Sequence, residues 1–122
     1  MRHRNKNKIL DRKKGPRELM LRNLASSILL YEKVKTTRAK AAAVRPLVER
    51  SITAAKAGDL TARRGLLKVL LQKNSVKKAI EVLGVRYKTR PGGYTRTTKL
   101  GTRAGDGAEM VQIELVSPYE KY

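Results

Sequence analysis

The residues that could carry out chemistry in this sequence are few and scattered. His3 is the only histidine, and it lies in a basic N-terminal stretch where it suits a phosphate or base contact better than proton transfer. Ser26 and Ser27 have no base near them in the sequence to activate either hydroxyl as a nucleophile. There is no cysteine, and therefore no disulfide framework and no thiolate metal site. We expect no catalysis, no small-molecule substrate and no cofactor.

The glycine-rich stretch GTRAGDG, residues 101–107, resembles a phosphate loop only in its glycine content. It lacks the GxxxxGK[ST] spacing that lets a P-loop cradle phosphates with backbone N–H groups. Asp106, alone between two glycines, makes a poor metal site. We interpret Gly105, Asp106 and Gly107 as the turn of a β-hairpin.

Positive charge is the strongest signal in the composition. The 122 residues include 29 Lys and Arg against 10 Asp and Glu, a formal net charge of +19. Self-repulsion of this size opposes compaction unless a polyanion neutralises it, so the candidate partners are nucleic acid, an anionic membrane and an acidic protein. No apolar run approaches the roughly 20 residues of a spanning helix, and the basic start leads into no signal-peptide core. We therefore expect a cytoplasmic protein.

The charge is concentrated in two segments. Residues 1–17 hold eight Lys or Arg and one Asp, and residues 84–103 hold six Lys or Arg and no acid. The second segment contains RPGGYTRTTKLGTR, residues 90–103, in which threonines separate the cations. Its glycines permit a bend and let a backbone approach phosphate, while its arginines can bind phosphate or stack on splayed bases. With one aromatic, this ribbon suits recognition of RNA shape and backbone better than base-by-base reading.

We predict that both segments and some nearby cations bind nucleic acid. The N-terminal cations cannot neutralise one another, and such runs often become ordered on a phosphate backbone. Tyr94 could equally be a core residue, and the sequence leaves that alternative open. If about ten phosphates are contacted, the log–log salt slope should lie roughly between −7 and −9. The predicted contact residues are Arg2, His3, Arg4, Lys6, Lys8, Arg12, Lys13, Lys14, Arg22, Arg38, Arg86, Lys88, Arg90, Gly92, Gly93, Tyr94, Arg96, Lys99 and Arg103.

The elements that position these residues follow from the periodicity of apolar side chains. Pro16 suits the first turn of a helix, where its missing N–H costs nothing. One face of this helix, at a spacing of three to four, comprises Met20, Leu24, Ser27, Ile28 and Tyr31. Residues 33–37, KVKTT, alternate and are partly β-branched, which indicates a strand. Thr36 or Thr37 can then cap the next helix.

A second helix is expected to run to about Ala57. Pro46 lies inside it and should kink the helix or mark a break. Its apolar stripe comprises Ala41, Val44, Val48, Ile52 and Ala55, and the cations Arg38, Arg45 and Lys56 share one flank.

Two further helices are expected before the chain changes to strands. Asp59 can cap a third helix that carries Leu60, Leu67 and Leu71, although Gly65 weakens it. Asn74 or Ser75 would cap a fourth, which Gly84 would end. The inward residues of the fourth helix are Val76, Ala79, Ile80 and Leu83.

Beyond Gly84 the period changes to two, which predicts strands over residues 94–100 and around residues 111–115. The expected order is α-β-α-α-α-β-β, an α+β fold with helices packed on one face of a small sheet. We expect a basic extended arm over residues 1–14, one globular domain over 15–116 and a mobile tail over 117–122.

Four stretches of the sequence carry a resemblance to a known family. They are MRHR at residues 1–4, RNLASSILLYEKVKTTRAKAAAVRPLVE at 22–49, RPGGYTR at 90–96 and GDGAEMVQIELV at 105–116. Together they closely resemble the bacterial ribosomal proteins of the large subunit numbered seventeen, from Met1 to about Val116. The stretch KKGPRE departs from the family pattern, because Pro16 stands where a histidine before Arg17 is common.

The resemblance implies a structural protein of the large (50S) subunit with no enzymatic activity. It would bind large-subunit (23S) ribosomal RNA near the exit of the peptide tunnel, support assembly of the subunit, and contact the small neighbouring protein numbered thirty-two. By resemblance, the RNA-facing residues would include Arg2, His3, Arg4, Arg90, Gly92, Gly93, Tyr94 and Arg96.

Two other classes of protein are alternatives. One is a DNA-binding architectural protein, although the sequence offers no apolar wedge on a β-arm and no recognition helix. The other is a cationic membrane-surface protein, although its helices lack the Trp and Phe that such helices favour.

Overall fold

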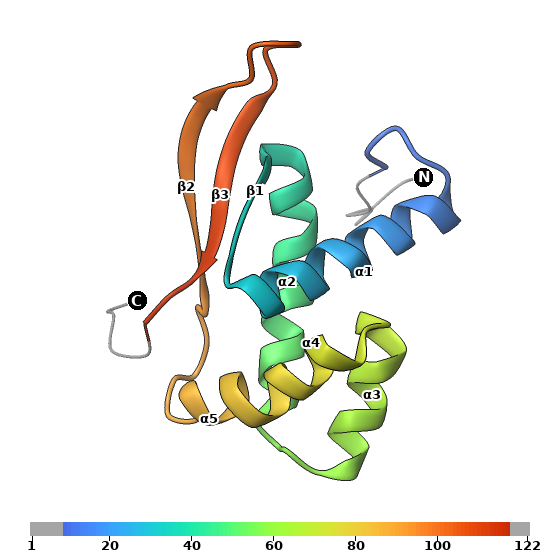
Figure 1. Ribbon diagram of the computed structural model, residues 1–122, viewed down its shortest axis with the longest axis vertical. Helices are drawn as coiled ribbons and strands as arrows, with labels where there is room; N and C mark the ends of the chain where they lie inside the picture. The colour runs from blue at the N-terminus through green and yellow to red at the C-terminus, as the bar shows by residue number, and fades with distance from the viewer. Residues whose placement is uncertain (1–8, 118–122) are drawn as a thin grey trace, which may run out of the picture.

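The computed structural model describes residues 9–117, so most of the expected C-terminal tail and most of the expected N-terminal arm lie outside the described residues. Helices pack against one face of a three-stranded antiparallel sheet, and a β-hairpin projects beyond them (Figure 1). This arrangement confirms the predicted α+β class. The elements are α1 (Lys14–Tyr31), β1 (Lys33–Thr37), α2 (Arg38–Ala55), α3 (Leu60–Leu70), α4 (Lys73–Lys78), the π-helical segment η1 (Ala79–Leu83), α5 (Gly84–Arg86), β2 (Thr95–Thr102) and β3 (Glu109–Leu115).

The sheet has the strand order β1-β3-β2, so the last strand of the chain lies in the middle. Val34 pairs with Ile113, and these side chains point toward the helices. Alternate residues of a strand point to opposite faces. Lys33 and Lys35 of β1 therefore lie on the face turned away from the helices, opposite Glu114 and Gln112 of β3.

The predicted hairpin turn is confirmed between β2 and β3. Arg103 N donates to the carbonyl of Ala108 at 2.8 Å, and Gly107 N donates to the carbonyl of Arg103 at 2.9 Å. Gly107 has φ +69°, a conformation that glycine adopts without strain.

The helix α1 starts at Lys14 with Pro16 in its first turn, as predicted, but its buried face differs from the prediction. Tyr31 is 70% exposed, whereas Ala25, Ser26, Ile28 and Leu29 are buried. Ser26 can lie in the core because both its polar groups are satisfied there. Its hydroxyl donates to the carbonyl of Leu70 at 2.6 Å, and its carbonyl accepts from Ser75 Oγ at 3.0 Å.

The helix α2 has the cap and the apolar stripe that the sequence predicts. Thr37 Oγ1 accepts from Lys40 N at 3.4 Å, and the five stripe residues are all buried. The alternative that Pro46 marks a break is wrong, because α2 continues through it. Pro46 and Ala42 are both exposed, so water can bond the Ala42 carbonyl that loses its helical donor.

The helix α3 has the predicted cap but not the predicted inner face. Asp59 Oδ1 accepts from Ala62 N at 2.8 Å. Leu66 and Leu70 are the buried leucines, and the expected set is exposed: Leu60, Leu67 and Leu71. Leucines stand in adjacent pairs at 66–67 and 70–71, so two stripes with the same period compete, and packing against the other helices selects one of them.

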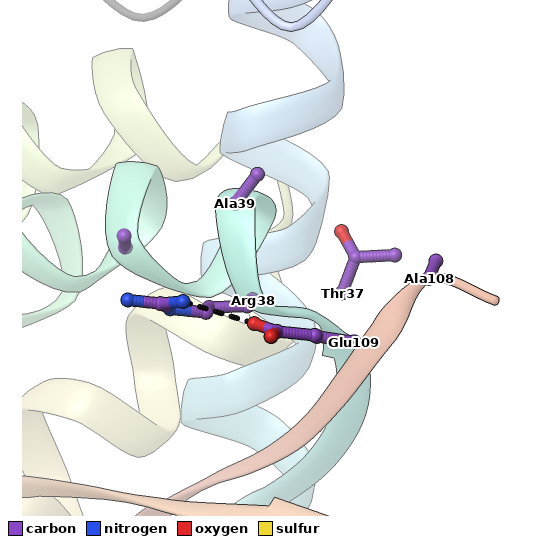
Figure 2. Close-up of a pocket in the computed structure, with 6 residues that line it drawn as sticks. Thr37, Arg38, Ala39, Ala108 and Glu109 are labelled. Atoms are coloured by element: carbon purple, nitrogen blue, oxygen red, sulfur yellow. Dashed lines mark hydrogen bonds and ion pairs between the residues drawn. The ribbon is translucent and has the colours of Figure 1, made fainter. Parts of the chain in front are cut away.

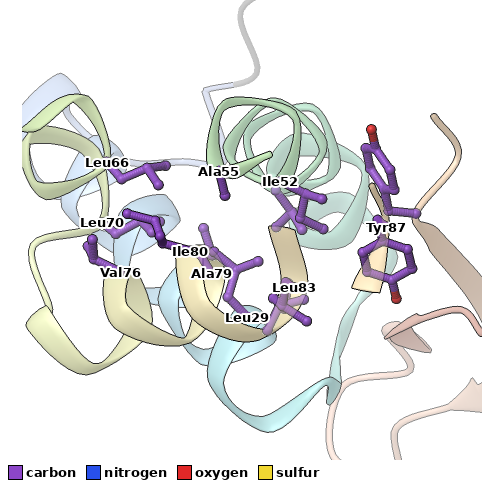
Figure 3. Close-up of a cluster of buried hydrophobic side chains, with 14 of the residues drawn as sticks. Leu29, Ile52, Ala55, Leu66, Leu70, Val76, Ala79, Ile80, Leu83 and Tyr87 are labelled. Atoms are coloured by element: carbon purple, nitrogen blue, oxygen red, sulfur yellow. The ribbon is translucent and has the colours of Figure 1, made fainter. Parts of the chain in front are cut away.

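Residues 73–86 form one continuous helix through α4, η1 and α5. Its inward residues are buried as predicted and pack against α2 and α3 (Figure 3). The predicted caps are wrong, because Gln72 is the N-cap and the Ser75 hydroxyl bonds Ser26 instead. The prediction that Gly84 ends the helix is also wrong. A Cβ at Gly84 would lie 2.6 Å from the Ala55 carbonyl oxygen, so this glycine serves the close approach of two helices.

Candidate nucleic-acid interface

Cations from three strands and the start of α2 surround the hairpin half of the molecule: Lys33, Lys35 and Arg96 lie on the open face of the sheet, and Lys99, the register partner of Val111, lies on the other face with Arg38. We call this the hairpin surface and define it by the cations Lys33, Lys35, Arg38, Arg96, Lys99 and Arg103 and the carboxylates Asp106, Glu109 and Glu114. Six cations against three carboxylates leave a net charge of +3. All six cations are exposed, and the hairpin that carries half of them extends past the helices (Figure 1).

Glu114 organises the open face of the sheet. Its side chain is largely buried, between Lys33 of β1 and Arg96 of β2, which are its register partners on the two sides. Arg96 donates to Glu114 Oε1 from Nε at 3.0 Å and from Nη2 at 2.9 Å, and Lys33 Nζ lies 3.8 Å from Oε2. A carboxylate beneath two cations holds them at the surface, which lowers the entropy they lose on binding an anion.

Two more ion pairs fix cations at the hairpin. Arg38 Nη1 donates to Glu109 Oε2 at 2.9 Å, across a hollow of about 520 Å³ between the start of α2 and β3 (Figure 2). Arg103 forms a bidentate pair with Asp106, with distances of 2.9 and 2.6 Å. These hydrogen bonds, together with one from Ala108 N, hold the pKa of Asp106 well below its usual 3.8.

Lys35 and Lys99 are the cations of the hairpin surface that have no ion pair with any carboxylate of the described residues. Their full charge is therefore available to a partner. Lys33 and Lys35 were not among the sequence-predicted contacts. The alternation in Lys33-Val34-Lys35 was the available signal, because it places both cations on one face of a strand.

Arg90 and Tyr94, predicted as contacts, are buried. Tyr94 is 1% exposed, and its ring packs 5.1 Å from that of Tyr87 and 4.9 Å from Lys56 Nζ. The alternative that Tyr94 is a core residue is therefore the correct one. Arg90 is 5% exposed, and its Nε donates to the carbonyls of Gly92 at 3.0 Å and Gly93 at 3.2 Å, which holds the loop before β2 in shape.

Arg86 is half-buried in an ion-pair cluster. It donates to Glu32, which also accepts from Lys78 Nζ at 3.1 Å. The hydrogen bond from Arg86 is the main cause that holds the pKa of Glu32 below its usual value; burial opposes it, and the hydrogen bond from Lys78 adds to the lowering. Of the other predicted contacts, Lys88 is exposed after α5 and Arg22 is half-buried on α1.

The described part of the N-terminal basic segment does not join the hairpin in the fold. Arg12 and Lys13 directly precede α1 and Lys14 begins it, and in Figure 1 this end of α1 lies on the opposite side of α2 from β2 and β3. The remaining predicted contacts lie outside the described residues: Arg2, His3, Arg4, Lys6 and Lys8.

A further basic surface, on α3 and α4, was absent from the predicted contacts. Residues 60–78 contain six cations and no carboxylate: Arg63, Arg64, Lys68, Lys73, Lys77 and Lys78. The absence of any Asp or Glu over these 19 residues was the feature of the sequence that could have indicated this basic surface.

Within residues 9–117, no helix combines the length and the apolar character that crossing a bilayer requires. The same residues contain no group of three or more His, Asp or Glu side chains placed to hold a metal ion.

Comparisons with known proteins give one consistent result. The family described as Ribosomal protein L17 matches residues 20–116. The chain is similar to proteins of several bacteria that are named "Large ribosomal subunit protein bL17". The Rickettsia typhi protein is 48% identical over 116 residues, which cover 95% of this chain and 85% of the relative. The Solibacter usitatus protein is 51% identical over 116 residues (95% and 77%), and that of Desulfitobacterium hafniense strain DCB-2 is 50% identical over 107 residues (88% and 96%).

Proposed function

This chain belongs to the ribosomal protein L17 family, and from that premise we propose that it is a structural, non-enzymatic component of the bacterial large ribosomal subunit that binds ribosomal RNA through its hairpin surface. It would act in the cytoplasm as part of the ribosome. The arm over residues 1–14 would hold a second RNA segment.

The observation that carries this proposal is the arrangement of charge on the hairpin surface. Lys35 and Lys99 keep their charge, and Lys33 and Arg96 are held in place by a buried carboxylate. Cations in fixed positions suit the regular phosphates of an RNA backbone. The described residues place no exposed stack of aromatic rings there, so the surface reads shape and backbone and not base identity.

The test is the salt dependence of binding to large-subunit ribosomal RNA. A variant with Lys35→Gln and Lys99→Gln should reduce the magnitude of the log–log salt slope by about 0.7–0.9 for each lost phosphate contact. Lys77→Gln on α4 is the matched control, because it removes a charge from an exposed position outside the hairpin surface. Equal effects of the double variant and the control, per charge removed, would mean that binding follows net charge alone and that the hairpin surface has no special role.

Three finer features rest on the family resemblance and on no contact described above. They are a position near the exit of the peptide tunnel, contact with the protein numbered thirty-two, and support of subunit assembly. An electron-microscopy map of large subunits that contain this chain would test the first two. Accumulation of precursor particles on depletion of the chain would test the third.

The alternative of a DNA-binding architectural protein fits this fold poorly. The hairpin would be the inserting arm, but its exposed apolar side chain is Leu100, 47% exposed, beside a bulge at Gly101 and among cations that suit a backbone. A preference for bent duplex DNA over ribosomal RNA at equal salt concentration would favour the DNA-binding alternative.

A further inference from the structure

An apolar groove between α2 and α3 lies outside the hairpin surface. It has a volume of about 340 Å³, and its lining comprises Leu47, Arg50, Ser51, Ala54, Gly65, Leu66 and Val69. Arg50 is the one charged side chain in this set. The Ser51 hydroxyl is already used within α2, where it donates to the carbonyl of Leu47 at 2.8 Å.

Gly65 is the unexpected residue in this groove. It stands in the middle of α3, where glycine is among the poorest helix formers. A Cβ built at Gly65 would meet no atom within 4 Å apart from those of its chain neighbours and of the backbone of its own helix, unlike one at Gly84. The packing of this chain therefore does not require a glycine at position 65. A side chain there would point into the groove and reduce the space for an occupant.

Charge around the groove indicates the chemistry of that occupant. Arg50 lies in the lining, and Lys68, one helical turn from Gly65, is exposed on α3. Residues 60–78 contain no carboxylate that could pair with either cation, and neither has an ion pair within residues 9–117. An occupant that brings its own carboxylate is therefore favoured, and a second copy of this basic surface is not.

The lining distinguishes a protein occupant from RNA. A nucleobase requires stacking rings or hydrogen-bonding groups for its edges, and the groove offers aliphatic carbons with Arg50 at its margin. Aliphatic side chains fill such a space and gain from leaving water. We propose that the groove between α2 and α3 binds a segment of another protein, one that inserts an aliphatic side chain beside Gly65 and presents an Asp or Glu to Arg50 and Lys68. This inference goes beyond the RNA interface and does not depend on it.

Photo-crosslinking in assembled large subunits tests the proposal. The full chain would carry p-benzoylphenylalanine in place of Ala54, which lines the groove and is exposed. The matched control carries it in place of Ala42, exposed on the same helix about 18 Å away and lining the hollow beside the hairpin. We expect a protease-sensitive adduct from position 54 and a ribonuclease-sensitive adduct from position 42.

The adduct from position 54 should contain a peptide with an aliphatic residue next to Asp or Glu. Its yield should fall at least fivefold when Gly65→Leu fills the groove or Arg50→Glu reverses the charge. A ribonuclease-sensitive adduct, an adduct with a second copy of this chain, or no adduct at position 54 would each overturn the proposal. The position 42 adduct and cosedimentation with the subunit report on the RNA-binding function separately.

A second measurement avoids the bulky crosslinker. A tagged Gly65→Leu chain, coproduced with the untagged chain, should be at least threefold under-represented in salt-washed large subunits, while the melting temperature of the free variant is not lowered. The milder Gly65→Ala should raise that melting temperature by about 4 °C, because alanine favours the helix. Equal incorporation of the tagged and untagged chains would show that nothing occupies the groove and would refute the inference.

Discussion

Replacing Gly84 with alanine isolates the contact that sets the distance between α2 and the helix over residues 73–86. The new Cβ would lie 2.6 Å from the carbonyl oxygen of Ala55 and 3.0 Å from its carbonyl carbon. These are backbone atoms, so no side-chain rotation can relieve the clash. The Ala55 carbonyl also accepts from Gly58 N at 3.1 Å, and moving it would strain that turn. The two helices must therefore separate.

The net cost follows from two opposing effects. Alanine is favoured over glycine in a helix by about 1 kcal/mol. Forcing a methyl group into a filled space costs about 1–3 kcal/mol. We take about 3 kcal/mol here, because both contacting atoms are fixed and the separation also loosens Leu83 and Ile52 in the core. The variant should then be less stable by about 2 kcal/mol, which for a domain of this length lowers the melting temperature by about 8 °C.

The assay is thermal unfolding followed by circular dichroism at 222 nm, with urea unfolding as a second measure. Gly65→Ala is the matched control, because it makes the same chemical change in a helix but meets no atom within 4 Å. The control should gain about 1 kcal/mol. If Gly84→Ala gained stability as well, the close approach at Ala55 would not be a constraint, and Gly84 would be a mere weak point in the helix.

Two carboxylates give further predictions. Glu32→Gln should lower stability at pH 7 by about 0.5–1 kcal/mol, the size expected for a partly exposed ion-pair cluster. The pKa of Glu32 is lowered in the folded state, so its contribution is present above the usual value of 4.5 and is lost as the pH falls below it. The difference between variant and parent in urea midpoint should therefore shrink from pH 7 to pH 3, and a constant difference would contradict this. Glu49→Ala should cost about 2–4 kcal/mol, because Glu49 accepts from Tyr94 N at 3.1 Å, Thr95 N at 3.2 Å and Thr95 Oγ1 at 2.7 Å. Urea unfolding would measure that loss, and Glu49→Gln, which keeps one acceptor oxygen, should lose clearly less.

The sequence predicts a helix face well where single apolar residues repeat among polar ones. That condition holds for α2 and for the helix over residues 73–86, and both buried stripes are confirmed. It fails in α3, where adjacent leucines offer two stripes of the same period, and in α1, where Ser26 is buried through bonds to α3 and α4. The α1 failure is decided by hydrogen bonds to residues 44 and 49 positions away, and the α3 failure by packing against the other helices, and a local pattern contains neither.

Gly84 shows the same limit for a single residue. A glycine after an apolar run is a common helix end, and it is equally suited to a close helix contact. Only the position of Ala55 on the neighbouring helix distinguishes the two roles.

For the candidate interface, the sequence located the exposed cations of the hairpin but not the buried members of the same segment. Arg96, Lys99 and Arg103 are exposed, as a solvent-facing ribbon requires. Arg90 and Tyr94 are buried because Glu49 of α2 and Lys56, the residue that follows α2, bind the loop that contains them. From the sequence alone, a polar residue in a basic segment is predicted to be exposed, because the distant residue that buries it is not known.

Glu114→Gln separates two explanations of why the hairpin surface would bind RNA. The substitution raises the net charge by one, so binding driven by charge alone would become tighter. If Glu114 instead acts by holding Arg96 and Lys33 in position, the freed side chains must be ordered on binding, at about 0.5–1.5 kcal/mol each. Affinity for ribosomal RNA at fixed salt should then fall about three- to tenfold despite the added charge, with circular dichroism as the check that the sheet is retained. Tighter binding by the folded variant would show that the carboxylate only offsets charge, and that the fixed positions of its partners contribute nothing.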